Sequence, residues 1–310
     1  WPRLVEVQKS LLEACEDADV RKRLHFDCAK ILHDRLNEVR SARRHLEAVL
    51  DEEPTHSDAL DLLSSILQMQ SDTEALQLRL TQAAQLEEDT ARQAELFGQL
   101  YDLLVDLEGA SSQKVEALCG LLDANPNQRE YADALLSLSR EEENFELRTN
   151  ALQRRIAAGG EKSELAGWHI EASTSCKKLR DLDGALEHLS SATDLMPSRD
   201  DAWSMMAQLQ EDEGQVAKSV LTLSKALEHF TKDQEPAQHF HVELARLNRH
   251  VGDNESEALH PSHVIDFGEY TDSDCMRLIE LLAKLGRHAE LGNRLESWAL
   301  RGQLLDAESL

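Results

Sequence analysis

The chain has 310 residues, of which 41% are hydrophobic and 4% aromatic, and its formal net charge is −26. Helix-forming Leu, Ala, Glu, Gln and Arg dominate and β-branched residues are scarce, so the composition favours an all-α protein. The negative charge disfavours nucleic acid and anionic membranes as partners, and no apolar run reaches membrane-spanning length, so we expect no membrane insertion.

The acidic character is concentrated in one part of the chain. Residues 1–50 hold ten Lys/Arg against nine Asp/Glu, whereas residues 51–110 hold two against fourteen. A charged surface of this kind serves solubility or attracts a basic partner. The chain opens inside a helical pattern without an initiator Met, so we expect a fragment of a longer protein.

Three prolines divide the first two thirds of the chain. Pro54, Pro126 and Pro197 lie 72 and 71 residues apart. The residues Ala42, Leu46 and Val49 precede Pro54 at the same spacing at which Ala185, Leu189 and Ala192 precede Pro197. Helix starts are expected between these prolines, near Asp89-Thr90 with Thr90 as N-cap and near Gly160-Glu161.

A period of 34 residues is clearest over residues 163–232. On an expected first helix, His169, Ala172, Ser173 and Cys176 fall 34 residues before Trp203, Met206, Ala207 and Gln210. On an expected second helix, Ala185, Leu189 and Ala192 fall 34 residues before Ser219, Leu223 and Ala226. Small residues match small ones and large apolar residues match large ones, which is typical of stacked helix pairs.

These residues resemble the tetratricopeptide family, whose repeat has a Trp and a small residue on its first helix and an Ala, a large residue and a Pro on its second. Trp203 takes the Trp place, Ala207 and Ser173 the small place, and Gly214 the turn. The resemblance is strongest over 163–232 and weaker over 23–162. It implies an α-solenoid of stacked antiparallel helix pairs, forming a right-handed superhelix, over residues 1–249.

The period fails in the last part of the chain. Residues 250–273 are rich in polar and turn residues, which predicts a linker or long loop. Residues 274–310 resume the helical pattern, with Gly286 as a break. They predict a C-terminal helix pair, either a further repeat or a cap.

No motif for catalysis, metal binding or cofactor binding is found. Five cysteines lie far apart without a C-x-x-C pair, which argues against disulfides and a zinc site and favours a cytoplasmic location. His239 and His241 are two residues apart, so on a helix they point to different faces. His260 and His263 fall in the expected linker and predict a solvated loop. We therefore expect no enzyme, no metal and no cofactor.

The resemblance implies a non-catalytic scaffold that binds a partner protein or peptide in a concave groove lined by first helices. An alternative is a regulatory or substrate-recruiting arm of an enzyme whose catalytic domain lies outside the chain. The acidic lining predicts a basic or amphipathic partner segment. The candidate partner-binding residues are those expected to point away from the core on three first helices: Asp58, Asp61, Ser65, Ile170, Thr174, Lys177, Asp201, Ser204, Gln208, Glu211 and Asp212.

Overall fold

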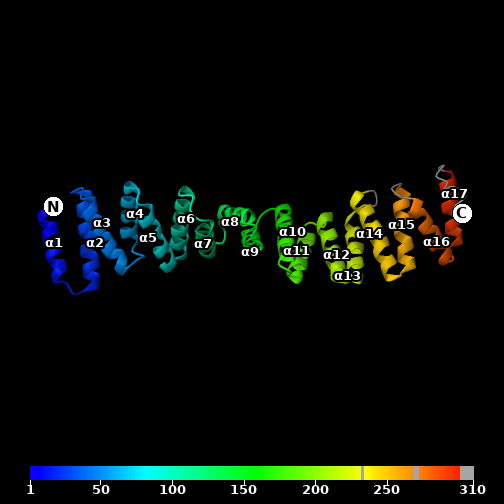
Figure 1. The fold of residues 1–310 in the computed structure, drawn as a ribbon, viewed down its shortest axis with the longest axis horizontal. Coiled ribbons are helices and arrows are strands. Elements are labelled where there is room, and N and C mark those ends of the chain that lie inside the picture. Colours follow the sequence, from blue (N-terminus) through cyan, green and yellow to red (C-terminus); the bar gives the residue numbers. More distant parts are fainter. Residues whose placement is uncertain (232–233, 268–271, 301–310) are drawn as a thin grey trace. The chain divides into compact units, whose positions relative to one another are not determined.

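The computed structural model describes residues 1–231, 234–267 and 272–300, and these form two compact units. Unit 1 comprises Trp1–Gly159 and unit 2 comprises Gly160–Leu310. Figure 1 labels the helices of both units. Unit 1 contains α1 (Pro2–Ala14), α2 (Ala18–Asp34), α3 (Val39–Glu52), α4 (Ser57–Gln70), α5 (Thr73–Leu86), α6 (Thr90–Asp106), α7 (Ser111–Ala124), α8 (Arg129–Glu141) and α9 (Phe145–Ala157).

Unit 2 contains α10 (Lys162–Lys178), α11 (Leu182–Leu195), α12 (Asp200–Asp212), α13 (Val216–Ala226), the 3₁₀ helix η1 (Leu227–His229), α14 (Glu235–Val251), α15 (Asn254–Phe267), α16 (Asp272–Lys284) and α17 (His288–Leu300). The described residues contain no strand, so the all-α prediction is confirmed. Within the same residues, none of the helices combines the length and low polarity needed to cross a bilayer.

Consecutive helices pack on one another within each unit, as the predicted stack of antiparallel helix pairs requires. We call the even-numbered helices from α2 to α16 the first helices, and the odd-numbered helices from α3 to α17 the second helices. Each first helix joins its second helix through a short connection. Gly214 ends the first helix α12 with φ 74°, a left-handed conformation that glycine adopts without a steric penalty.

The three prolines follow one repeated backbone geometry. The residue that ends α3 has φ −139° and ψ 85°, the residue that ends α7 has φ −141° and ψ 89°, and the residue that ends α11 has φ −137° and ψ 84°. A residue held outside the helical region before proline avoids the clash between the proline ring and the preceding backbone. Pro54, Pro126 and Pro197 therefore end second helices in the same way, as predicted.

The two helix starts expected between the prolines are present. α6 begins at Thr90, and its N-cap is Asp89, one residue before the predicted cap, whose carboxylate accepts hydrogen bonds from the N–H groups of Ala91 and Arg92. α10 begins after Glu161, which forms a capping box with Glu164. Both caps satisfy backbone donors that a helix start leaves without partners.

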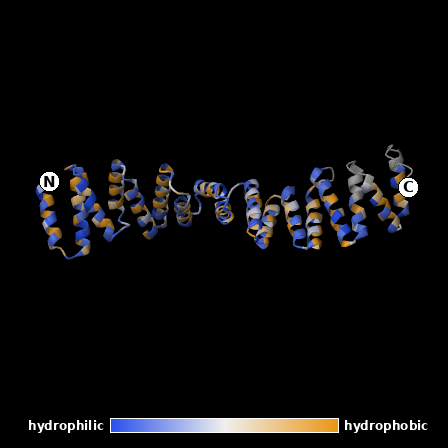
Figure 2. Cartoon of the chain, in the orientation of Figure 1, coloured by the Kyte–Doolittle hydropathy of each residue, from blue (hydrophilic) through white to orange (hydrophobic). Residues whose placement is uncertain are grey.

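The small and large positions of the 34-residue period form the core of unit 2. Ala185, Leu189 and Ala192 are at most 1% exposed and pack with Cys176. Trp203 belongs to a cluster with Ala207, Leu223 and Ala226, and its indole N–H donates to the carbonyl of Pro197 at 2.9 Å. Figure 2 shows hydrophobic and hydrophilic residues on the same helices, as expected where one stripe of a helix is buried.

A contact between two histidines recurs in three helix pairs. The Nδ1 atoms of the two rings are 2.8 Å apart in the pair formed by α2 and α3, and 3.0 Å apart in the pairs formed by α10 and α11 and by α14 and α15. In each case one ring comes from the first helix and the other from the second. The pairs are His25–His45, His169–His188 and His241–His260.

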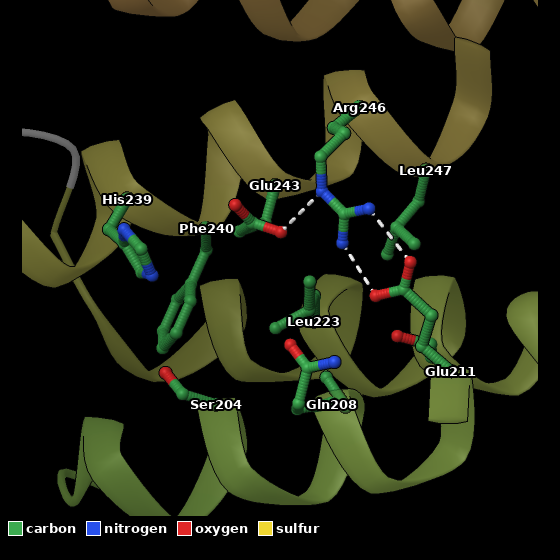
Figure 3. A pocket seen from close by; sticks show the side chains of 11 residues that line it. Ser204, Gln208, Glu211, Leu223, His239, Phe240, Glu243, Arg246 and Leu247 are labelled. Carbon is green, nitrogen blue, oxygen red and sulfur yellow. Dashed lines mark hydrogen bonds and ion pairs between the residues drawn. The ribbon is translucent and has the colours of Figure 1, made fainter. Parts of the chain in front are cut away.

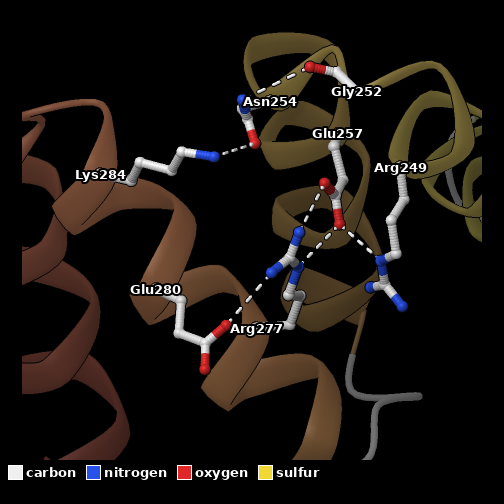
Figure 4. Close-up of polar contacts among 7 residues, drawn as sticks. All are labelled: Arg249, Gly252, Asn254, Glu257, Arg277, Glu280 and Lys284. Carbon is white, nitrogen blue, oxygen red and sulfur yellow. Dashed lines mark hydrogen bonds and ion pairs between the residues drawn. The ribbon is translucent and has the colours of Figure 1, made fainter.

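The structure corrects the predicted linker at 250–273, because α15 occupies most of this segment. The side of α15 that is buried includes polar residues: Glu257 is 1% exposed and His260 is 8% exposed. Figure 4 shows the Glu257 carboxylate accepting from Arg249 on α14 and from Arg277 on α16. A search for apolar periodicity misses such a helix, because ionic partners replace part of the apolar stripe.

Two helices occupy most of the described part of the segment 274–310, for which a C-terminal helix pair was expected. Residues 274–284 belong to α16 and residues 288–300 to α17, and Gly286 lies between these helices with φ 70°. The first residues of α16 lie within the predicted linker. Residues 301–310 of the predicted pair lie outside the described residues.

Candidate partner-binding groove

The candidate residues on α4 form polar contacts within unit 1. Asp58 is exposed in the first turn of α4. Asp61 forms an ion pair with Arg92 on the next first helix, α6, at 2.5 Å. The Ser65 hydroxyl donates to the carbonyl of Leu62 within its own helix. An ion pair between successive first helices is thus the main tertiary contact of this set.

The same kind of ion pair links the first helices of unit 2. Lys177 on α10 pairs with Asp212 on α12 at 3.1 Å, and Glu211 on α12 pairs with Arg246 on α14 at 2.5 Å. Hydrogen bonds from Gln208 and Lys177 lower the pKa of Asp212. The acidic side of these helices is therefore partly neutralised by neighbouring basic residues.

Three further candidates on α10 and α12, Ile170, Thr174 and Asp201, do not line the groove described below. Ile170 is half-buried and packs against the core of unit 2, and the exposed Thr174 donates to its carbonyl. Asp201 accepts two hydrogen bonds from Arg199, just before α12. These contacts stabilise local structure.

A groove of about 200 Å³ lies between the first helices α12 and α14, with α13 contributing to its lining. Ser204, Gln208 and Glu211 line it from α12 at a spacing of one helical face. Phe240 and Leu247 are buried on α14 and line the same groove. The structure thus brings three of the eleven predicted residues together in one groove.

The charged part of the groove centres on Arg246. Figure 3 shows its guanidinium between two carboxylates, with Nη1 and Nη2 bonded to Glu211 and Nε bonded to Glu243 at 2.9 Å. These hydrogen bonds raise the pKa of Arg246 and lower the pKa of Glu211. Arg246 and Glu211 are therefore charged at neutral pH, and the formal charges of the two carboxylates and the guanidinium sum to one net negative charge.

Sequence reasoning missed the wall of the groove contributed by α14. His239, Glu243 and Arg246 line the groove from this helix but lie beyond the region where the 34-residue period is clear. The spacing of His239 and His241, two residues apart on a helix, indicated that their rings point to different faces. His239 is exposed at the groove, whereas His241 is buried against His260, so the two rings point to different faces as expected.

Metal and thiol chemistry find no support in the described residues. They contain no cluster of three or more His, Cys, Asp or Glu side chains with the geometry to hold a metal ion. Burial raises the pKa of the Cys28 and Cys119 thiols, which lowers the reactivity of both thiols.

The comparisons with known proteins bear on the type of fold alone. No family model matches the sequence, and no curated protein matches it significantly. A tetratricopeptide repeat protein from Parabacteroides merdae is 16% identical, with 84% of this chain and 98% of that chain covered and a TM-score of 0.31. The C-terminal part of a TPR repeat-containing protein from Cytophaga hutchinsonii is 11% identical, with 82% and 99% covered and a TM-score of 0.40.

A chain in the structure of Naa15/Naa10 bound to HypK-THB is 12% identical, with 93% of this chain and 43% of that chain covered and a TM-score of 0.45. The stacked helix pairs and the repeated geometry before the three prolines are features of this chain itself, and they agree with what the resemblance implies for the fold.

Proposed function

We propose that this chain is a non-catalytic protein-interaction scaffold and that the groove between α12 and α14 binds a segment of a partner protein. The observation that carries the proposal is the composition of the groove. Its lining combines buried apolar residues, Leu223, Phe240 and Leu247, with polar groups from two successive first helices. An apolar lining with a few placed polar groups is typical of binding sites.

The size and charge of the groove define the segment it suits. A volume of about 200 Å³ accommodates one or two side chains, so we expect the partner to insert an anchor rather than a whole helix. Glu211 and Glu243 together exceed the charge of Arg246 by one, which favours a lysine or arginine beside the anchor. The partner is therefore expected to be a basic or amphipathic segment.

Affinity capture followed by mass spectrometry tests the proposal. The full chain serves as bait beside two variants, Gln208→Trp and Leu221→Trp. Gln208 is exposed and lines the groove, so a tryptophan there fills it. Leu221 is 70% exposed on α13 and does not line the groove, so it is the matched control.

A partner recovered by the wild type and by Leu221→Trp but lost with Gln208→Trp supports the proposal. Circular dichroism verifies that both variants keep the helical content of the wild type. Equal recovery by both variants would show that the groove does not bind the partner.

A further inference from the structure

A second groove, of about 370 Å³, lies in unit 1 on the side of the second helices. Its walls are the second helices α5 and α7, and its floor is the first helix α6 that connects them in the chain. The groove between α12 and α14 has the opposite construction, because its walls are first helices. The two grooves share no residue.

The floor of this second groove is apolar. Phe97, Leu100 and Leu104 line it from α6 at the spacing of one helical face, and each is less than 9% exposed. Gly120 on α7 makes this arrangement possible, because a Cβ atom at that position would lie 2.5 Å from the Phe97 ring. The missing side chain lets the phenylalanine ring pack directly against the backbone of α7.

Leu78 supplies an exposed apolar wall. It lines the groove from α5 and is 56% exposed. Because a little more than half of this side chain is exposed, covering it with a partner gains about half of what complete burial of an exposed leucine gains. The groove is therefore an apolar channel with one leucine already in contact with water.

The rim of the groove is acidic and lacks basic partners. Glu74 and Glu116 line it, and neither forms an ion pair among the described residues; Glu116 accepts a hydrogen bond from the Gln85 amide at 3.4 Å. The segment 51–110 has only two basic residues, Arg79 and Arg92, and the α7 wall adds Lys114, which does not line the groove. The two arginines are already paired, Arg79 with Asp51 and Arg92 with Asp61 and Glu95.

We infer that this groove docks a basic amphipathic helix of a partner protein. Apolar residues of that helix would cover Leu78 and the floor from α6, and its lysine or arginine residues would lie beside Glu74 and Glu116. The two helical walls and the apolar floor leave a channel of the kind into which an amphipathic helix lays its apolar face. The surplus of carboxylates favours a positive partner over a negative one.

A fluorescence-anisotropy titration with a labelled model peptide tests this inference on the full chain. The probe is a helical peptide of leucine and lysine with the leucines on one face. The control probe has the same composition in an order that spreads the leucines around the helix. Because both probes carry the same charge, non-specific attraction to the acidic chain affects both equally.

Two exposed leucines of α5 provide the matched variants. Leu78→Lys removes the apolar wall of the groove, whereas Leu86→Lys changes a leucine that is 58% exposed on the same helix and does not line the groove. Both variants add the same charge. We expect Leu78→Lys to weaken binding of the amphipathic probe about tenfold, as loss of one covered leucine implies, and Leu86→Lys to leave it within about twofold.

The expected result has a second part: the control probe binds about tenfold more weakly than the amphipathic probe. Equal binding of the two probes would overturn the inference, as would equal effects of the two variants or no binding of the amphipathic probe. Since both variants lie in unit 1, these outcomes are independent of the groove between α12 and α14.

Discussion

Nδ1 of His25 lies 2.8 Å from Nδ1 of His45, so one ring donates a hydrogen bond to the other between α2 and α3. This geometry requires that at least one ring be neutral, because two protonated imidazoles have only donors. The contact therefore links the packing of this helix pair to pH.

We predict that His45 remains neutral well below the usual range for histidine. Burial lowers its pKa to about 4, with smaller contributions from the charges of His25 and Lys9. Burial also lowers the pKa of His25, while Glu52 raises it and Arg21 lowers it further. A side-chain NMR titration of the wild type checks this, and titration of His45 near 6.5 would contradict it.

The same shift has a consequence for stability. A histidine whose pKa is lower in the folded chain than in the unfolded chain stabilises the fold above pH 6.5, and this contribution is lost as pH falls toward 4. The His45→Asn variant should therefore lose less free energy of unfolding between pH 7 and pH 5 than the wild type does. Urea unfolding at the two pH values measures the difference, and identical losses would count against the prediction.

Glu257→Gln should destabilise unit 2 by about 2–3 kcal/mol, because it removes charge-assisted hydrogen bonds to a buried carboxylate. Burial alone would raise the pKa of Glu257, but the hydrogen bonds from Arg277 and Arg249 outweigh it and the net shift is downward. The matched control is Glu280→Gln, since Glu280 is 63% exposed and also pairs with Arg277. Urea unfolding should show a change within about 0.5 kcal/mol for the control, and equal effects would refute this account of the cluster.

Gly120→Ala should destabilise unit 1 by about 1–2 kcal/mol. Alanine improves helix propensity, but its Cβ would overlap the Phe97 ring, and overpacking costs more than the propensity gains. The double variant Gly120→Ala/Phe97→Leu should recover part of the loss.

At Gly167 on α10 nothing lies within 4 Å of an added Cβ, so the contrasting variant Gly167→Ala should stabilise unit 2 by up to about 1 kcal/mol. Thermal unfolding that ranks the two alanine variants the other way would contradict this.

Binding of the partner captured through the groove between α12 and α14 should weaken as salt rises. The groove carries a net negative charge from Glu211, Glu243 and Arg246, and ions screen its attraction for a basic segment. Calorimetric titration at about 50 and about 300 mM salt should give a dissociation constant about three- to tenfold higher at the upper concentration. An unchanged constant would indicate that apolar contacts dominate.

The repeat could be predicted from sequence because it depends on packing positions. Ala185, Leu189 and Ala192 recur with a period, and small residues at close helix contacts are recognisable without a structure. α15 could not be predicted in this way, since Glu257 and His260 are buried through specific partners on other helices. Ionic and histidine contacts depend on residues far apart in sequence and leave no apolar period.

The lining of the groove between α12 and α14 was also predictable only in part, because it depends on contacts between separate helices. Ser204, Gln208 and Glu211 on α12 point away from the core of unit 2, as their helical spacing indicates. Whether outward residues line a shared groove depends on the next first helix, and the α14 wall lies outside the clear period. The histidine spacing was visible in the sequence, at 19 or 20 residues between partners, but its meaning required the antiparallel pairing of the helices.

Photo-crosslinking tests the central claim, that the groove between α12 and α14 binds the partner segment, most directly. A benzophenone amino acid replaces Gln208, His239 or, as the control, Leu221, and the captured partner is irradiated with each variant. We predict that positions 208 and 239 crosslink to one short basic or amphipathic segment of the partner and that position 221 does not. Crosslinking through position 221, with none from positions 208 and 239, would contradict the account.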